Sequence, residues 1–297
     1  MVSVMAGLVP AIHVLILRRK FVEARDCPGH DESLRFAQEV NVAEQYPWKL
    51  AWITGASGAI CGEIAQRLAA EGVTVAATAR PSDRLYALAG QYETIKTFPA
   101  DVLNPQELKA CVAKIEAMLG PIDLALFGAG MYVPFNIRNI DLDGFHRTMA
   151  VNVDGVINGV AAVLPSMLAR KAGHIAIMGS LFGYAGWPEN GSYGASKAAV
   201  INLAESLKLE LEGTGVDVTI INPGFVDTPL NAAYDPKKKL YAMSKERCAR
   251  KILEKLSGRP YEIAFPPQVA GFLKTVRSLP RRVSFPLIRW FTRTMQQ

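Results

Sequence analysis

Tyr193 and Lys197 are the residues whose types and spacing best suit proton transfer. They lie four apart at the start of a strongly helical segment, so their side chains share one face of a helix. A tyrosine hydroxyl ordinarily titrates near pH ~10. A neighbouring ammonium group stabilises the phenolate and lowers that pKa, which makes the tyrosine a usable acid or base near neutrality. Because ordinary surface pairs share this spacing, the assignment depends on the features around it.

Two further features suggest ligand binding. Ser180 ends the apolar run HIAIMGS, and a serine at the carboxyl end of a strand could hydrogen-bond a substrate carbonyl. Residues 54–58 (TGASG) end the apolar run LAWIT and lead into a helix. Glycines there allow a tight turn, and the helix N-terminus presents N–H groups and a positive dipole to a pyrophosphate. The turn lacks the GxxxxGK[ST] pattern, which disfavours an NTPase.

The residue that follows the second strand bears on the choice of cofactor. Sites that prefer NAD usually carry an acid there to bind the ribose hydroxyls. This chain has Arg80 instead, which could pair with a 2′-phosphate. The sequence therefore favours NADP over NAD, the alternative being that Arg80 is an ordinary surface residue.

The elements that must position these groups alternate along the chain. Continuous apolar strands alternate with helices, which predicts a parallel sheet covered on both faces. We predict an α/β fold: a doubly wound, Rossmann-like sheet of about seven strands in a single domain over residues 48–265. The predicted strands are LAWIT, VTVAATA, TIKTFPAD, IDLALFGAG, HIAIMGS, VDVTIIN and YEIAF, and the principal predicted helices cover residues 105–120, 141–170, 192–212 and 244–256.

Taken together, the motifs resemble the compact single-domain branch of the short-chain dehydrogenase/reductase family. The segment 193–197 (YGASK) matches the family's YxxxK, and Ser180 lies thirteen residues before Tyr193, the family's usual interval. The resemblance implies that Asn152, Ser180, Tyr193 and Lys197 are catalytic. In that scheme Tyr193 is the general acid or base, Lys197 binds the nicotinamide ribose, Ser180 orients the carbonyl and Asn152 holds a relay water.

The resemblance also implies a dinucleotide site along one edge of the sheet. Residues 101–102 match the pair that contacts adenine, and residues 222–228 match the segment that holds the nicotinamide carboxamide. The expected cofactor-binding residues are Gly55, Ser57, Gly58, Ile60, Arg80, Asp101, Val102, Ala129, Tyr193, Lys197, Pro223, Gly224, Val226 and Thr228.

Three positions depart from the family pattern. Ala59 and Cys61 stand where the family's TGxxxGxG has its second and third glycines, and Gly128 replaces the asparagine of the family's NAG. Cys61 adds bulk where the helix normally packs closely on the sheet or the cofactor. We expect these changes to affect cofactor affinity and stability more than the type of reaction.

The two ends of the chain differ from its middle. Residues 1–47 are predicted to be an extension outside the working fold, because residues 5–31 resemble repeat elements that are translated when a bacterial reading frame is started too early. Their apolar run at 8–17 is too short to span a bilayer, and a short amphipathic membrane anchor is the alternative. Residues 237–297 carry 15 Lys and Arg against three acids, a net +12, so the remainder of this +6 chain sums to −6. Within it, residues 266–297 form a basic amphipathic tail. Its apolar residues are expected to pack on the domain with the arginines in solvent, or alternatively to contact anionic lipid.

These features lead to one expected function and several rivals. We expect an NADP-dependent enzyme that transfers a hydride between nicotinamide and the carbonyl or alcohol of a small apolar substrate. The loop at 181–192 and a lid within residues 225–256 would provide specificity, through Leu181, Phe182, Tyr184, Trp187, Leu230, Tyr234, Leu240, Tyr241 and Met243. The main alternative is a non-catalytic NADP-binding regulator or scaffold on the same fold.

The sequence also leads to predictions about partners, metals, assembly and location. An extended-branch epimerase would need a larger C-terminal domain, and a nucleic-acid binder is disfavoured by the −6 body of the chain. No metal is expected, because no acid or cysteine stands at ligand spacing beside the histidines. The family implies a homo-dimer or tetramer through the helices at 141–170 and 192–212. Four widely spaced cysteines favour a cytoplasmic protein, with the tail allowing peripheral membrane contact.

Overall fold

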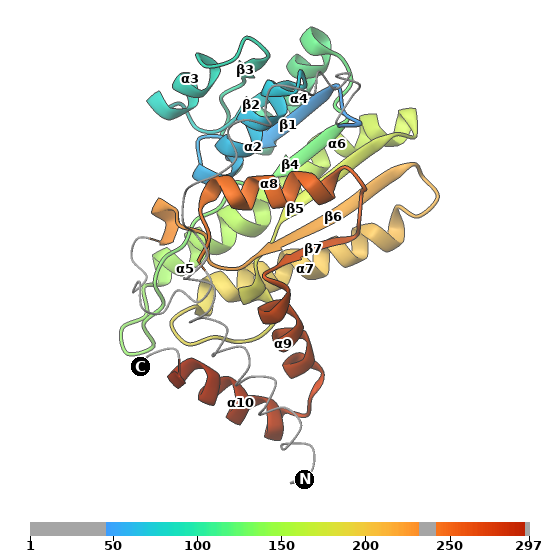
Figure 1. Ribbon diagram of the computed structural model, residues 1–297. Helices are drawn as coiled ribbons and strands as arrows, with labels where there is room; N and C mark the ends of the chain where they lie inside the picture. The colour runs from blue at the N-terminus through green and yellow to red at the C-terminus, as the bar shows by residue number, and fades with distance from the viewer. Residues whose placement is uncertain (1–45, 232–241, 295–297) are drawn as a thin grey trace, which may run out of the picture. The chain divides into compact units, whose positions relative to one another are not determined.

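The strands form one parallel sheet because each is an apolar run that needs cover on both faces. The computed structural model describes residues 46–231 and 242–294. Its seven strands follow the order β3-β2-β1-β4-β5-β6-β7, as Figure 1 shows. They are β1 (Leu50–Thr54), β2 (Thr74–Thr78), β3 (Ile95–Thr97), β4 (Leu124–Phe127), β5 (Gly173–Met178), β6 (Val216–Pro223) and β7 (Glu262–Phe265). The predicted doubly wound α/β fold is confirmed.

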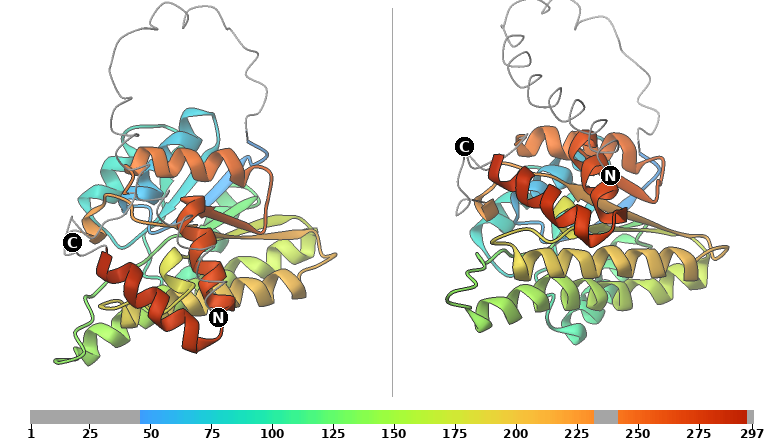
Figure 2. Two further views of the ribbon diagram at one scale, coloured as in Figure 1. Left: turned by 60° about the horizontal axis from the view of Figure 1, so that its bottom comes forward. Right: turned by 90° about the horizontal axis from the view of Figure 1, so that it is seen from below.

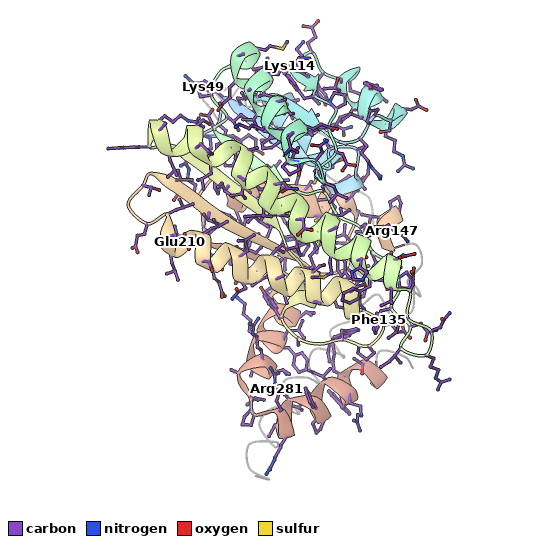
Figure 3. The ribbon with its side chains drawn as sticks, turned by 180° about the vertical axis from the view of Figure 1, so that it is seen from behind. Lys49, Lys114, Phe135, Arg147, Glu210 and Arg281 are labelled. Atoms are coloured by element: carbon purple, nitrogen blue, oxygen red, sulfur yellow. The ribbon has the colours of Figure 1, made fainter. Side chains whose placement is uncertain are left out.

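Helices cover the two faces of the sheet in two groups. The helices α2 (Ala59–Ala70), α3 (Asp83–Ala89) and α8 (Lys245–Leu256) pack on one face, and α4 (Pro105–Leu119), α6 (Gly155–Arg170) and α7 (Gly191–Glu210) pack on the other. In β1, Ile53 faces the first group and Trp52 the second, as the alternation of a strand requires. Figure 1 shows α8 in front of the sheet, and Figure 3 shows α6 and α7 in front when the domain is seen from behind.

The helical segment predicted over residues 141–170 contains an irregular turn. It consists of α5 (Leu142–Met149), a π-helical turn at Ala150–Asp154, and α6. By length and hydropathy the stretch could cross a membrane, but α6 buries Val156, Val160 and Val163 in the core against the sheet. The segment therefore behaves in this domain as a core helix.

Two further helices follow β7. They are α9 (Pro267–Ser278) and α10 (Arg281–Thr294), joined by a short turn in Figure 2. Ala270 and Leu273 of α9 join the core on the α7 side of the sheet, and Leu287 and Ile288 of α10 form a smaller cluster with Val276. Residues 1–45 of the predicted extension and 232–241 of the predicted lid lie outside the described residues.

Candidate active site

The turn after β1 is shaped for close approach of a ligand. Gly55 has φ +68°, and a Cβ built on it would lie 2.6 Å from the backbone nitrogen of Ala129. Gly58 is the N-cap of α2, with no side-chain cap hydrogen bond and no acid in the first turn. The first N–H groups of α2, at Ala59 and Ile60, therefore have no capping side chain as acceptor. They make the N-terminus of the helix positively polarised and able to bind an anion. This arrangement fits the pyrophosphate of a dinucleotide.

The two main departures from the family pattern lie against each other. A Cβ built on Gly128 would lie 2.1 Å from the Cys61 Sγ, far inside contact distance. The Cys61 side chain, which is 4% exposed, therefore occupies the space that any side chain at position 128 would need. The thiol thus fills the volume that the side chain of an asparagine at position 128 would need.

The remaining expected cofactor residues lie just beyond the carboxyl ends of parallel strands, and so at the same edge of the sheet. Arg80 is exposed after β2. Asp101 and Val102 follow β3, where the Asp101 carboxylate accepts a hydrogen bond from the backbone N–H of Leu103 (3.0 Å) and the Val102 carbonyl accepts one from the Asn158 side chain (2.9 Å). The others at this edge are Ser57, Ala129, Pro223, Gly224, Val226 and Thr228.

Lys197 is held at this edge by a backbone group. Its Nζ donates a hydrogen bond to the carbonyl of Met178, the last residue of β5, at 2.7 Å. The same nitrogen lies 5.7 Å from the centroid of the Tyr193 ring. Both residues belong to the first two turns of α7, so the predicted spacing brings them together.

Ser180 completes the constellation from the end of β5. It is the N-cap of a short 3-10 turn at Leu181–Gly183, where its Oγ accepts a hydrogen bond from the Phe182 N–H (3.2 Å). Its side chain is also hydrogen-bonded to Tyr193. Ser180, Tyr193 and Lys197 therefore meet at one place, as the sequence predicts.

The predicted direction of the Tyr193 pKa is wrong for this structure. Burial raises the pKa of Tyr193 to about 12, although the hydrogen bond with Ser180 acts in the opposite direction. Burial also lowers the pKa of Lys197 to about 8, while its interaction with the Cys61 thiol acts to raise it. Lys197 is buried with its Nζ over the ring of the partly exposed Tyr193, so burial opposes the lowering of the Tyr193 pKa that a neighbouring ammonium alone would produce.

Asn152 lies within the π-helical turn and is fully buried. Its Oδ1 accepts a hydrogen bond from the Met131 N–H (2.8 Å), and its Nδ2 donates to the Met131 carbonyl (3.0 Å) and to the Ser196 Oγ (2.9 Å). A Cβ built on Gly130 would lie 3.4 Å from Asn152 Oδ1 and 3.9 Å from Lys197 Nζ. Asn152 thus ties the loop after β4 to α7 beside the lysine.

A small pocket opens at Ser180 and Tyr193. Tyr132 is a member of its wall that the sequence did not indicate, and its ring packs edge-on against Tyr193 with centroids 5.5 Å apart. The only feature of the sequence that could have indicated Tyr132 is its position shortly after β4, at the edge of the sheet where ligands bind. The lining residues are Tyr132, Ser180, Phe182, Asn190, Tyr193, Gly224 and Phe225.

Several residues expected to line the pocket serve other purposes. Leu181 and Tyr184 are buried in the core, and Met243 pairs in an isolated bridge with Val226. Trp187 packs edge-on against Phe182, with ring centroids 5.5 Å apart. Of the others, Phe182 lines the pocket, Leu230 is 40% exposed, and Tyr234, Leu240 and Tyr241 lie outside the described residues.

A polar network connects the C-terminal helices to the strand that leads into the site. Glu262 of β7 accepts hydrogen bonds from Tyr184, from Lys274 of α9 and from the Asn222 side chain, the last at 3.1 Å. Asn222 also donates to the Tyr184 hydroxyl (3.0 Å). Because Asn222 directly precedes Pro223, this network holds α9 to the end of β6 where the pocket lies.

The fold agrees with the comparisons. Residues 49–239 match the family model described as short chain dehydrogenase, and the chain belongs to that family. An uncharacterised oxidoreductase of Staphylococcus saprophyticus is 37% identical over 199 residues, which cover 65% of this chain and 85% of that protein. A similar oxidoreductase of Staphylococcus aureus strain MW2 is 35% identical over 196 residues, again covering 65% and 85%.

Solved structures give the same result. A short-chain dehydrogenase from Streptomyces avermitilis has a TM-score of 0.69 at 22% identity, covering 83% of this chain and 98% of that one, and shows the shared fold. An alcohol dehydrogenase from Thermococcus sibiricus, solved in complex with 5-hydroxy-NADP, has a TM-score of 0.66 at 26% identity, covering 73% and 96%. The protein is therefore an oxidoreductase of this family, and membership implies a nicotinamide dinucleotide as cofactor.

Proposed function

We propose that the protein transfers a hydride between NADP and the carbonyl or alcohol group of a small apolar substrate. The observation that carries the proposal is that Ser180 and Tyr193 line one pocket at the ligand edge of the sheet, with the buried Lys197 Nζ beside the Tyr193 ring. A serine hydroxyl, a phenol and an ammonium so arranged can orient a carbonyl, exchange a proton with its oxygen and stabilise the charge left behind.

The chain's own residues account for positioning and proton movement. When bound, the nicotinamide supplies or accepts the hydride. In the reducing direction Ser180 hydrogen-bonds the substrate oxygen, and Tyr193 gives that oxygen a proton as negative charge develops on it. The Lys197 ammonium stabilises the resulting phenolate. Asn152, beside Lys197, connects the lysine to solvent through water, so that the phenol recovers its proton before the next cycle.

The residues present also fit the cofactor. The open N-terminus of α2, behind Gly55, Ser57, Gly58 and Ile60, would hold the pyrophosphate. Asp101 and Val102 would contact the adenine, while residues 223–228 and Lys197 would hold the nicotinamide end. Arg80 would pair with a 2′-phosphate, which favours NADP, with NAD as a weaker cofactor. The Thermococcus relative's complex with an NADP derivative supports the same preference.

The substrate class follows from the lining of the pocket. Phe182 and Phe225 provide apolar surface, and their rings pack edge-on with centroids 5.1 Å apart. A small pocket with aromatic rings beside the Ser180 and Tyr193 hydroxyls suits a compact aldehyde, ketone or alcohol.

Replacement of the proposed acid tests the function. Tyr193→Phe keeps the ring and its packing against Tyr132, so we expect an intact fold and unchanged cofactor affinity with turnover reduced about 10²–10⁴-fold. The assay is a cofactor-consumption screen over carbonyl and alcohol libraries, with affinity measured by nicotinamide fluorescence. Tyr132→Phe is the matched control, because it removes a hydroxyl from the same pocket but not the proposed proton donor.

Two results would contradict the proposal. Turnover by Tyr193→Phe at the wild-type rate would remove Tyr193 as the acid. Tight cofactor binding by the wild type without turnover of any carbonyl or alcohol would favour the alternative of a non-catalytic NADP-binding regulator or scaffold. The altered glycine turn was the sequence argument for that alternative, and the packing of Cys61 against Gly128 weakens it.

We also propose self-association through α6 and α7, as the family implies. These helices expose the apolar side chains of Ile157 (40%), Leu168 (39%) and Leu209 (74%). A homo-dimer or tetramer would cover them. Sedimentation of the wild type as a monomer at micromolar concentration would argue against this assembly.

A further inference from the structure

The outer side of α10 combines positive charge with aromatic surface. Arg281, Arg282, Phe285, Arg289 and Trp290 are all exposed, Phe285 at 58% and Trp290 at 43%. At 100° per residue these five positions fall within one half of the helix circumference, with Arg282 and Arg289 near its centre. We call this half the basic–aromatic face.

The opposite side of α10 is anchored to the domain. Leu287 and Ile288 are buried in a cluster with Val276 of α9, and Ser284 is fully buried. Phe291 stacks on Phe272 of α9, with ring centroids 4.6 Å apart. The helix is therefore fixed with its basic–aromatic face outward.

We infer that the basic–aromatic face docks on a lipid bilayer that contains anionic phospholipid. Interfacial helices of this kind carry arginine or lysine beside exposed Phe or Trp, so that rings enter the headgroup boundary while cations bind phosphate. The sequence contains no acid after Glu262, so α10 brings no negative charge to that surface. An α-helix of 14 residues is about 21 Å long, enough for several headgroup contacts along one side.

Charge also favours a bilayer over two other possible partners of this face, a second copy of the chain and a nucleic acid. In a two-fold dimer built on this face, arginines of one copy would meet the same arginines of the other, with no acid on the face to pair with them. A nucleic acid would meet a chain whose first 236 residues are net negative, at −6. A membrane needs only the narrow strip that α10 offers.

The anchored side of α10 lies close to the loop at 181–192 that borders the pocket. Phe291 packs on Trp187 (5.8 Å between ring centroids), and Trp187 packs on Phe182, which lines the pocket. If the proposed function holds, docking therefore places the domain that holds the pocket at a source of lipophilic substrate. The docking itself does not depend on the reaction, and it is measured without substrate or cofactor.

The test uses the full-length protein and vesicle flotation. One set of vesicles is phosphatidylcholine alone, and the other is phosphatidylcholine with phosphatidylglycerol. The test variant is Arg282→Glu/Arg289→Glu, and the matched control is Lys109→Glu/Lys114→Glu on α4, which changes net charge equally. Figure 3 shows Lys114 and Arg281 at opposite ends of the domain. Neither variant touches the catalytic residues, so turnover of a soluble substrate should stay at the wild-type level.

We expect wild type and control to float with the anionic vesicles, and this binding to weaken as salt rises. Loss of two cationic contacts should weaken binding of the test variant by roughly 30-fold or more. Equal loss in test and control variants would overturn the inference, as would absence of wild-type binding to anionic vesicles. Loss of a dimer, or of binding to duplex DNA, confined to the test variant would also overturn it, in favour of a second copy or a nucleic acid.

Discussion

The packing of Cys61 against Gly128 predicts strong coupling between two positions that are remote in sequence. Gly128→Ala places a methyl group 2.1 Å from the Cys61 Sγ, whereas non-bonded carbon contacts are ordinarily about 3.5–4 Å. Either the Cys61 side chain must rotate away from its packed position, or the helix or the loop after β4 must shift, and overpacking of this kind costs about 1–3 kcal/mol of unfolding free energy. Cys61→Ala alone should cost about 1 kcal/mol, the burial of one sulfur atom.

The double variant should lose less unfolding free energy than the two single variants lose together. Without the sulfur, the nearest remaining atoms to the new methyl are Leu126 Cδ2 and the Thr54 carbonyl oxygen, both at 3.3 Å, which small adjustments can accommodate. We expect a coupling free energy of about 1–2 kcal/mol from urea unfolding of the four proteins. Cofactor affinity measured by nicotinamide fluorescence should follow the same pattern, because Gly128 adjoins the turn at Gly55.

The control cycle pairs Gly128→Ala with Cys111→Ala, since Cys111 belongs to the other core cluster. That pair should be additive within about 0.5 kcal/mol. If the Cys61 and Gly128 changes were equally additive, the thiol would not be filling the vacant space, and the reasoning about the altered glycine turn would be refuted.

Three further predictions concern charge. Arg80→Ala should weaken binding of NADP about tenfold or more and leave NAD nearly unchanged, by fluorescence titration; equal losses would remove Arg80 from the 2′-phosphate site. Lys197→Met should abolish turnover yet raise the unfolding free energy at pH 7 by about 1–3 kcal/mol. The pKa of Lys197, about 8, lies below the usual 10.5, so the fold destabilises the charged form of the lysine. The gain in stability of the variant over the wild type should therefore shrink as pH rises through 8 toward 10.5. Burial, with Arg259 nearby, lowers the pKa of His174 to about 4. The unfolding free energy present above pH 6.5 should therefore fall by up to about 3 kcal/mol as pH falls toward 4. His174→Gln should reduce this pH dependence, whereas the control His146→Gln, at an exposed position of α5, should not.

The sheet could be read from the sequence because its signal is local. Each strand is a short apolar run, and the order of strands and helices restricts the topology to a few arrangements. The meeting of Ser180 with Tyr193 and Lys197 was also accessible, since strand ends of a parallel sheet share one edge. The residues that pack beside them were not, because that depends on distances across elements.

Three features show where local reasoning stops. The packing of Cys61 against Gly128 joins α2 to the loop after β4, and nothing near either residue signals the other. The direction of the Tyr193 pKa depends on burial, which a residue pair alone does not indicate. The basic tail indicated amphipathic character, but which arginines face outward depends on how α10 packs against Val276 of α9.

The network around Glu262 gives the last helices a role in shaping the enzyme's interior. A chain shortened before Pro267 would lose Lys274, and with it the cation that compensates a carboxylate set between Tyr184 and Asn222. The uncompensated charge would remain on Glu262, which is hydrogen-bonded to Asn222, the residue directly before Pro223. Trimming the C-terminus to improve crystallisation or expression would therefore disturb residues 223–228, which are proposed to hold the nicotinamide, even though every motif used to recognise the family would still be present.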